Sequence, residues 1–347
     1  MSTDLATPAP PAVAVLIPCY NEALTIADVV REFHEQLPEA AIYVFDNNST
    51  DGTAERARRA GAIVMTERRQ GKGYVVQSMF QMIEADIYLM VDGDGTYPPA
   101  NVGALIAPVR DAEADMVIGS RLHALSHSQF KLLNLFGNTF FLALLNWMFK
   151  AKLTDLLSGY RAFSRRFVKS VPLSGGGFEI EAELTIKGLE RGYRIVEVPV
   201  DLGKRPRGSH SKIRLVQDGI LILNTILALF RDNKPLTFFG STGILLTGVA
   251  VILAVTLIIG HHDPGSQSQL IATVVASALF IAGLLLMVVG LVLHTIVRKF
   301  QELSHLETLA YHRALAGIEE RAGQQGDDGR SAARTHDRDA DPTSVAR

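Results

Sequence analysis

The stretch that decides the fold is Ile87-Tyr-Leu-Met-Val91-Asp92-Gly93-Asp94-Gly95-Thr96-Tyr97-Pro98-Pro99, an apolar run followed at once by two carboxylates. The run Ile87–Val91 predicts a buried strand, and the Asp and Gly residues after it are typical of a tight turn. Carboxylates one residue apart after a strand can also point to the same side. Such a pair suits a divalent cation that bridges a diphosphate, because Mg²⁺ prefers one or two carboxylates plus substrate phosphates. Taken alone, the pattern favours the turn.

Neighbouring segments change this balance. Short apolar runs alternate with helical patterns at a spacing typical of βαβ units, which predicts an α/β fold with a mainly parallel sheet and helices on both faces. Ligands bind such sheets at the carboxyl ends of the strands, so the loops that follow the strands matter most. The further predicted strands are Val13–Ile17, Ile42–Phe45, Ile63–Thr66, Met116–Ile118 and Ile195–Val198, and the predicted helices include Glu22–Gln36, Thr53–Ala60 and Tyr74–Glu84.

Three more of these loops carry polar residues. The first strand is followed by Pro18-Cys-Tyr-Asn-Glu22 and the second by Asp46-Asn-Asn-Ser-Thr-Asp-Gly-Thr53, a cluster suited to cap a helix. The third is followed by Gly71-Lys72-Gly73, where glycine permits close backbone approach and lysine can pair with an anion. Together the four loops indicate a nucleotide pocket at one edge of the sheet.

These motifs, PCYNE, DNNSTDGT, GKG and DGDGTYPP, resemble those of glycosyltransferase family 2. The resemblance covers about residues 13–212 and implies a GT-A fold that binds a nucleotide-diphosphate sugar. It also implies that Asp92 and Asp94 form a DxD-type site for Mg²⁺ or Mn²⁺. The family usually has two adjacent acids at the end of the second strand, whereas here Phe45 precedes the acid. The donor-binding residues that the resemblance implies are Pro18, Tyr20, Glu22, Asp46, Lys72 and Asp92.

The second half of this region contains charged groups between apolar segments, in GSR (119–121), TDLLSGYR (154–161) and GFEIE (177–181). A run of five Lys or Arg residues without an acid, residues 204–214, then precedes an apolar helix and is expected to attract anionic headgroups. Taken by itself, such a run more commonly serves simple electrostatic anchoring without catalysis. The RGSHSK and GYRAF segments, however, resemble those of polyprenyl-phosphate sugar synthases. That resemblance implies that Arg121, Arg207, Ser211 and Lys212 bind phosphate, and it leaves Asp155, Glu179 and Glu181 as candidates for catalytic base, sugar or metal roles. The Gln-x-x-Arg-Trp motif of processive polysaccharide synthases is missing, since the single Trp lies in Asn146-Trp147-Met148.

Two long runs without Lys, Arg, Asp or Glu follow, Leu236–Gly260 and Leu270–Val297. Each exceeds the roughly 20 residues that cross a bilayer as a helix. Basic residues flank both runs on their outer sides, so the positive-inside rule predicts a cytoplasmic catalytic domain and cytoplasmic termini. A pair of buried core helices is the alternative. Residues 130–149 and 213–230 are apolar with scattered polar groups, which fits either the headgroup plane or packing against the transmembrane hairpin.

The composition agrees with a membrane protein. The mean hydropathy is +0.18, the formal net charge is −2 and there is a single cysteine, so nothing indicates nucleic-acid binding, a disulfide or a Cys-based zinc site. Residues 1–12 lack the apolar core of a secretory signal. We expect a disordered lead (1–12), a catalytic domain (13–212), an interfacial helix (213–234), two transmembrane helices (235–298), a cytoplasmic helix (299–322) and a disordered tail (323–347).

The function predicted from the sequence is an inverting transfer of a hexose from a UDP- or GDP-linked sugar to polyprenyl phosphate at the cytoplasmic membrane face. A glycerolipid or a growing glycan is the alternative acceptor, and a catalytically silent membrane scaffold is the alternative of another class. The wider family favours UDP. The sequence leaves open the sugar, the metal and whether the chain forms a homo-oligomer.

Overall fold

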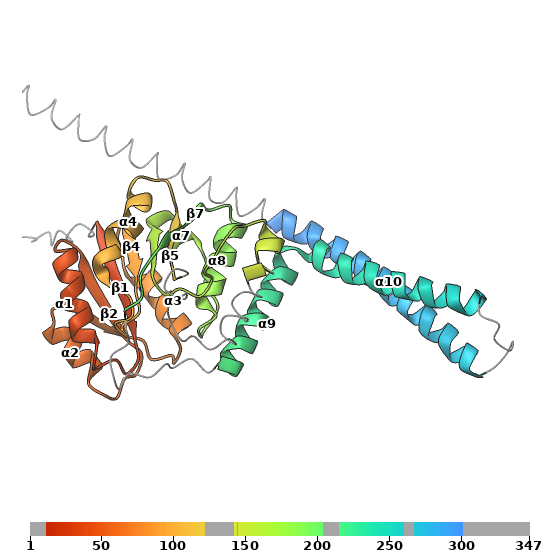
Figure 1. Ribbon diagram of the computed structural model, residues 1–347, viewed down its shortest axis with the longest axis horizontal. Coiled ribbons are helices and arrows are strands. Elements are labelled where there is room, and N and C mark those ends of the chain that lie inside the picture. Colours follow the sequence, from red (N-terminus) through yellow and green to blue (C-terminus); the bar gives the residue numbers. More distant parts are fainter. Residues whose placement is uncertain (1–11, 122–141, 144, 204–214, 260–266, 301–347) are drawn as a thin grey trace, which may run out of the picture. The chain divides into compact units, whose positions relative to one another are not determined.

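A computed structural model describes residues 12–121, 142–143, 145–203, 215–259 and 267–300 (Figure 1). The chain divides into two compact units, Met1–Phe230 and Arg231–Arg347. The elements of the first unit, in chain order, are β1 (Val13–Cys19), α1 (Ile26–Gln36), β2 (Ala41–Asp46), α2 (Thr53–Arg59), β3 (Ile63–Thr66), α3 (Lys72–Met82), β4 (Ile87–Met90), η1 (Pro99–Asn101), α4 (Val102–Arg110), β5 (Met116–Ser120), β6 (Arg161–Ser164), α7 (Arg165–Ser170), α8 (Ile180–Glu190) and β7 (Ile195–Pro199).

The first unit is built on a seven-stranded sheet with the order β3-β2-β1-β4-β6-β5-β7. Strand β1 pairs in parallel with β2 and β4, β2 with β3, and β5 with β7. Strand β6 runs antiparallel between β4 and β5. The mainly parallel sheet predicted from the sequence is therefore confirmed, and each predicted strand lies in it. Strand β6 was not predicted from the sequence.

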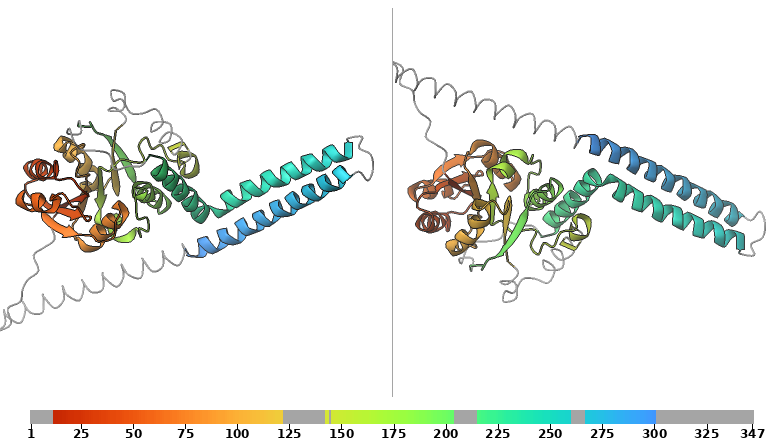
Figure 2. Two further views of the ribbon diagram at one scale, coloured as in Figure 1. Left: turned by 90° about the horizontal axis from the view of Figure 1, so that it is seen from below. Right: turned by 90° about the horizontal axis from the view of Figure 1, so that it is seen from above.

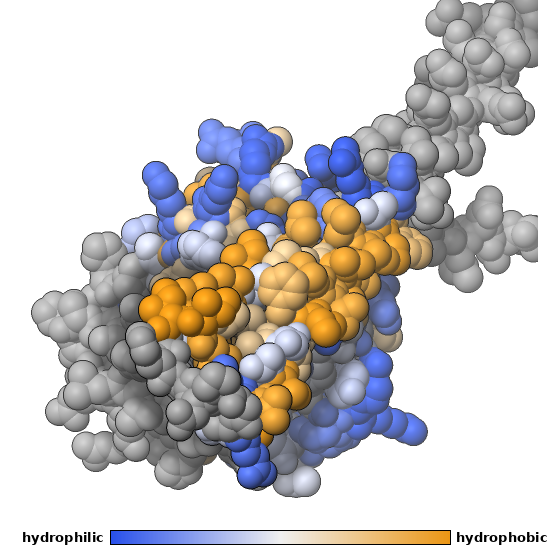
Figure 3. All heavy atoms as spheres, turned by 90° about the vertical axis from the view of Figure 1, so that its right-hand side faces the viewer, coloured by the Kyte–Doolittle hydropathy of each residue, from blue (hydrophilic) through white to orange (hydrophobic). Residues whose placement is uncertain are grey.

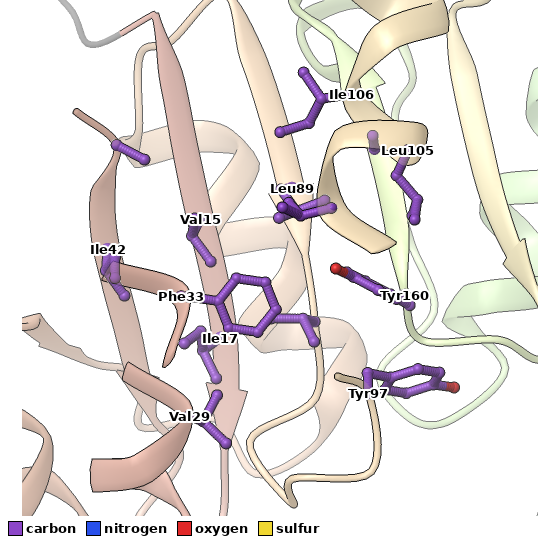
Figure 4. Packing of buried hydrophobic residues seen from close by; sticks show 14 of the residues in the cluster. Val15, Ile17, Val29, Phe33, Ile42, Leu89, Tyr97, Leu105, Ile106 and Tyr160 are labelled. Carbon is purple, nitrogen blue, oxygen red and sulfur yellow. The ribbon is translucent and has the colours of Figure 1, made fainter. Parts of the chain in front are cut away.

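Both faces of the sheet are covered, because alternate strand residues enter two separate cores. Val15 and Ile17 of β1 pack with Phe33 of α1 and Leu105 of α4 on one face, as Figure 4 shows. Leu16 of the same strand packs on the other face in a core that contains residues of α3, α7 and α8. Strands buried on both sides read as continuous apolar runs, which is why the inner strands were visible in the sequence.

Helix α9 (Leu215–Asn233) follows the last strand. Its residues Ile222, Ile226 and Phe230, spaced by four, are buried, and the Phe230 ring lies edge-on to Trp147 with centroids 6.0 Å apart. Helix α9 thus packs one side against its own domain. This burial accounts for one side of the region predicted to be interfacial.

The second unit contains two helices long and apolar enough to cross a membrane, α10 (Pro235–Ile259) and Gln267–Phe300 (Figure 2). Only 11% and 17% of their most apolar windows are buried, unlike the helices of a soluble core. Figure 3 shows large apolar side chains gathered on one face of the molecule. The two helices approach each other through glycine, since a Cβ on Gly243 would lie 2.6 Å from the Gly283 carbonyl oxygen. Small residues at such contacts let membrane helices pack closely.

Candidate active site

The carboxyl ends of β1 and β2 form one side of the site. Asp46 ends β2, and its side chain is only 7% exposed. Its Oδ2 atom accepts a hydrogen bond from the Ser49 backbone N–H at 3.2 Å, whereas Oδ1 is buried without a hydrogen-bond partner among the described residues. A buried acceptor without a partner is costly in a folded protein. Asp46 Oδ1 is therefore suited to accept a hydrogen bond from a ligand.

Asn47, next in the chain, fixes the loop that carries Lys72. Its Oδ1 atom accepts a hydrogen bond from the Gly71 N–H at 2.8 Å, and its Nδ2 atom donates to the carbonyls of Glu67 and Arg69, both at 2.8 Å. This asparagine lies within the DNNSTDGT motif, but its role could not be predicted from the sequence. Its side chain joins the end of β2 to the start of α3.

The glycines beside Lys72 permit a close backbone contact with the 175–177 loop. A Cβ on Gly71 would lie 2.0 Å from the Gly176 carbonyl oxygen, and one on Gly73 would lie 2.1 Å from that of Gly175. Gly71 also has φ of +137°, a conformation that favours glycine. The first residue of α3 is thus held against the loop that leads into α8.

Lys72 lies between two carboxylates. Its Nζ atom is 2.6 Å from Asp92 Oδ1 and 2.6 Å from Glu181 Oε1. The Lys72 side chain is 12% exposed, that of Asp92 28% and that of Glu181 5%. Burial alone would lower the pKa of Lys72, but the charges of Asp92 and Glu181 outweigh it and raise the pKa. The lysine is therefore a fixed cation at the carboxyl end of β4.

Asp92 and Asp94 differ in their surroundings. Asp94 is 9% exposed, and its Oδ1 atom accepts hydrogen bonds from the Thr96 backbone N–H at 3.0 Å and from its hydroxyl at 2.6 Å. Among the described residues there is no group of three or more Asp, Glu, His or Cys that could hold a metal ion. Two carboxylates nevertheless fit a cation whose remaining ligands are substrate phosphates, as Mg²⁺ prefers. The residues present are thus compatible with a metal that is completed by a diphosphate.

Asp92 depends on Gly159, a residue that sequence analysis left without a role. A Cβ at Gly159 would lie 2.3 Å from Asp92 Oδ2 and 2.7 Å from its Cγ. The Gly159 N–H donates to the hydroxyl of Tyr97 at 3.1 Å, which holds the glycine in place. Only the absence of a side chain at position 159 lets the carboxylate lie where it does.

Arg121 and Asp155 form a second charged pair. Arg121 donates to the carboxylate twice, from Nε at 2.6 Å to Oδ2 and from Nη2 at 2.7 Å to Oδ1. The Asp155 side chain is 2% exposed, and Glu197 accepts hydrogen bonds from the backbone N–H groups of Thr154 and Asp155. Burial would lower the pKa of Arg121, but Tyr97 and Asp155 raise it. Asp155 thus holds the guanidinium through a bidentate pair, the strongest form of this contact.

A fully buried arginine, Arg161, holds the 154–160 loop that carries Asp155. Arg161 begins β6 and donates from Nε to the Ser158 carbonyl at 2.8 Å, from Nη2 to that of Leu156 at 2.7 Å, and from Nη1 to the Thr185 hydroxyl at 2.8 Å. Burial lowers its pKa to about 10, which still leaves it charged at neutral pH. Arg161 therefore ties the 154–160 loop to α8, which carries Glu181.

Glu179 precedes α8 and is 5% exposed. Its Oε1 atom accepts a hydrogen bond from the Gly177 N–H at 2.9 Å, and its Oε2 atom is buried without a partner among the described residues. Like Asp46, it offers a buried acceptor to a ligand. Glu183, one turn further on, instead accepts hydrogen bonds from Ser174, Gly175 and Lys187 and serves the loop.

Similar proteins show the family of this chain. The glycosyl transferase family 2 model matches residues 14–171. Glycosyltransferase AglJ of Haloferax volcanii is 36% identical over 248 residues, which cover 71% of this chain and 81% of that protein. The chain belongs to glycosyltransferase family 2.

Other proteins of known name or structure are also similar to this family 2 glycosyltransferase. The dolichyl-phosphate hexose transferase of Haloferax volcanii is 28% identical over 64% of this chain and 95% of its own length. The crystal structure of glucosyl-3-phosphoglycerate synthase from Mycobacterium tuberculosis with Mn²⁺, UDP and glucosyl-3-phosphoglycerate superposes with a TM-score of 0.54 at 23% identity, over 63% of this chain and 80% of that one. This likeness shows the GT-A fold.

The glycosyltransferase fold brings most of the predicted site residues to the carboxyl edge of the sheet. Pro18 lies in β1, the 41% exposed Tyr20 and the half-buried Glu22 follow it, and the Glu22 N–H donates to the Thr53 hydroxyl at 2.8 Å. Three of the predicted phosphate ligands, Arg207, Ser211 and Lys212, lie outside the described residues. The contacts of Lys72 with Glu181 and of Arg121 with Asp155 join residues 109 and 34 positions apart, which no local motif could indicate.

Proposed function

We propose that this family 2 glycosyltransferase moves a hexose from a nucleotide-diphosphate sugar to polyprenyl phosphate at the cytoplasmic face of a membrane, with inversion at the anomeric carbon. The names of its relatives support the acceptor, because a similar protein is a dolichyl-phosphate hexose transferase. A neighbour in structure that holds UDP and Mn²⁺ supports the donor and the metal.

The observation that carries the proposal is the meeting of two fixed cations at one edge of the sheet. Lys72 contacts Asp92 on the side formed by β1 to β4, and Arg121 follows β5. The two sides are close enough for the charge of Asp92 to act on Arg121. The donor diphosphate and the acceptor phosphate are both anions, so an enzyme that transfers a sugar from one to the other needs a cation for each.

On the donor side, we assign Asp46 Oδ1 to the nucleoside and Lys72 to the diphosphate. A cation held by Asp92 and Asp94, Mg²⁺ or Mn²⁺, would stabilise the charge that develops on the departing nucleoside diphosphate. Pro18 near the end of β1, with Tyr20 and Glu22 in the loop that follows, contributes to the same pocket.

On the acceptor side, Arg121 binds the phosphate of the lipid. Asp155 occupies its Nε and Nη2 atoms, and Nη1 has no hydrogen-bond partner among the described residues. Nη1 is thus a donor that can bind an anion while Asp155 holds the other side of the guanidinium. Arg207, Ser211 and Lys212 complete this phosphate site in the proposal.

A phosphate oxygen is already ionised near neutral pH, so it needs little help from a general base. For a hydroxyl acceptor, in contrast, a carboxylate base contributes about 10²–10⁴-fold. Asp155 is engaged with Arg121, so we assign it to positioning. The buried Oε2 atom of Glu179 is then suited to orient the sugar by accepting a hydroxyl hydrogen bond.

The two apolar helices of the second unit support attachment to a membrane. Arg231 and Lys234 precede them, and Arg298 and Lys299 lie at the end of the second helix. By the positive-inside rule, these ends and the catalytic domain face the cytoplasm.

The test uses membranes from cells that express the full chain. They are incubated with radiolabelled UDP- and GDP-hexoses, polyprenyl phosphate and Mg²⁺ or Mn²⁺, with and without a chelator, and the lipid extract is chromatographed. We expect a metal-dependent glycolipid that mild acid cleaves, its loss with Asp94→Asn, and its retention with Gly103→Ala, a change on the exposed side of α4 with nothing within 4 Å.

The outcomes separate the parts of the proposal. Free sugar without labelled lipid would support the proposed donor and contradict the proposed acceptor. Label on a glycerolipid or a glycan would show that this molecule, and not polyprenyl phosphate, is the acceptor. The absence of turnover with every donor would overturn the proposal in favour of a membrane scaffold.

A further inference from the structure

The contact between Lys72 and Asp92 places a positive charge where a metal ion would bind. Asp92 Oδ1 accepts a hydrogen bond of 2.6 Å from the lysine ammonium, so one oxygen of the carboxylate already faces a positive charge. A divalent cation that bound Asp92 in this arrangement would lie beside that charge. Within about 4 Å, one like charge changes a binding constant by more than tenfold, even at an effective dielectric constant of 20.

The position of the lysine is built into the fold. Gly71 and Gly73 pack their backbones against Gly176 and Gly175, and the Gly73 N–H donates to the Gly176 carbonyl at 3.2 Å. The backbone thus places the mostly buried Lys72 side chain within reach of both Asp92 and Glu181. Lys72 therefore differs from an exposed surface lysine, because its ion pairs are fixed by the packing of the backbone around it.

We propose that Lys72 is a resident counter-ion that opposes metal binding at Asp92 until a nucleoside diphosphate arrives. The diphosphate offers the ammonium a new anionic partner, and the charge then shifts from Asp92 to the donor. This inference rests on the proposed function, because it needs a metal at Asp92 and Asp94. It predicts that metal and nucleotide binding are coupled, with each binding more tightly in the presence of the other.

Glu181 moderates the effect of Lys72 on metal binding. It contacts the same ammonium at 2.6 Å and is 5% exposed, so it shares the charge of Lys72 with Asp92. Without this second carboxylate, the lysine would pair with Asp92 alone and oppose the metal more strongly. Removal of the lysine and removal of the glutamate should therefore change metal affinity in opposite directions.

The experiment measures Mn²⁺ binding to the full chain in detergent from the electron paramagnetic resonance signal of free Mn²⁺, with and without UDP. For Lys72→Met we expect affinity without UDP to rise by about tenfold or more and the gain on adding UDP to shrink. Glu181→Gln should weaken binding without UDP. Lys169→Met is the matched control, because Lys169 donates to the Phe80 and Ile83 carbonyls at the far end of α3, and it should leave affinity unchanged.

Asp92→Asn identifies the site being measured. If wild type and Asp92→Asn bind Mn²⁺ alike even with UDP, the proposed metal site fails and the inference fails with it. If Asp92→Asn loses binding but Lys72→Met binds Mn²⁺ no more tightly than wild type, the metal site stands and the counter-ion role is refuted. Circular dichroism checks folding, and the double variant Lys72→Met/Glu181→Gln, which leaves no buried unpaired acid, should also bind more tightly than wild type.

Discussion

Replacement of Gly159 by alanine tests whether the position of Asp92 matters for transfer. Its φ is not in the left-handed region, so the backbone accepts alanine without strain. The new methyl group would, however, lie 2.3 Å from Asp92 Oδ2, whereas ordinary contacts begin near 3.4 Å. Asp92 must therefore move by about 1 Å, away from the position in which Lys72 holds it.

This shift has two expected consequences of different size. Insertion of a methyl group into a packed site costs about 1–3 kcal/mol of stability. A displacement of about 1 Å in a catalytic group lowers the rate on the order of 10²-fold. Because most of the chain should remain folded at that loss of stability, the fall in activity should greatly exceed the fall in folded protein.

The assay combines initial rates of glycolipid formation with a thermal unfolding curve for the same preparation. Gly103→Ala in α4 is the control, because nothing lies within 4 Å of the added methyl group. It should keep full activity and gain about 0.4–1 kcal/mol of stability. A Gly159→Ala enzyme with more than half of the wild-type rate would refute the argument that Gly159 positions Asp92 for the reaction.

Three further perturbations test separate parts of the molecule. Arg121→Lys removes the two-pronged contact with Asp155 and should raise the KM for polyprenyl phosphate by about tenfold or more, while the Kd for UDP in a binding titration stays the same. The side-chain hydrogen bond from Arg69 lowers the pKa of Glu67 from 4.5 to about 2, so this carboxylate stabilises the fold above pH 4.5. Stability measured by denaturant titration should fall as the pH drops from 4.5 toward 2, and less steeply in Glu67→Gln. Gly243→Val should push the two apolar helices apart and lower the thermal midpoint in micelles, while Gly248→Val, with nothing within 4 Å, should not.

The sequence was sufficient to predict the strands of the parallel part of the sheet, because they are apolar runs that end in polar loops. Strand β6 escaped detection for a physical reason. It has four residues, begins with the charged Arg161 and follows the turn-forming Ser158 and Gly159. The charge of Arg161 is tolerated only because carbonyls of the 154–160 loop accept its hydrogen bonds, and those partners are supplied by the folded structure.

The candidate site shows the same division. Motifs at the strand ends identified Asp46, Lys72 and Asp92 one at a time, since each lies next to the turn residues that a ligand loop requires. The partners of these residues depend on tertiary structure. Glu181 reaches Lys72 from α8, and Gly159 makes room for Asp92, through contacts that span 109 and 67 positions of the chain. Neither pairing leaves a pattern that a single sequence displays.

The pairing of each cation with a carboxylate has a consequence for the proposed reaction. Two unit charges about 4 Å apart repel by about 4 kcal/mol at an effective dielectric constant of 20, so cations beside two phosphate-bearing substrates favour their approach. Lys72 and Arg121 supply such charges, but a buried cation without a partner would itself destabilise the fold. Asp92 and Asp155 remove that penalty before the substrates bind, and the phosphates then share the same cations. Because Glu181 still pairs with Lys72 when Asp92 is changed, the sharper test is Asp155→Asn. This change leaves Arg121 without its carboxylate, so we expect the affinity for the phosphate acceptor to fall even though the net positive charge of the site has increased.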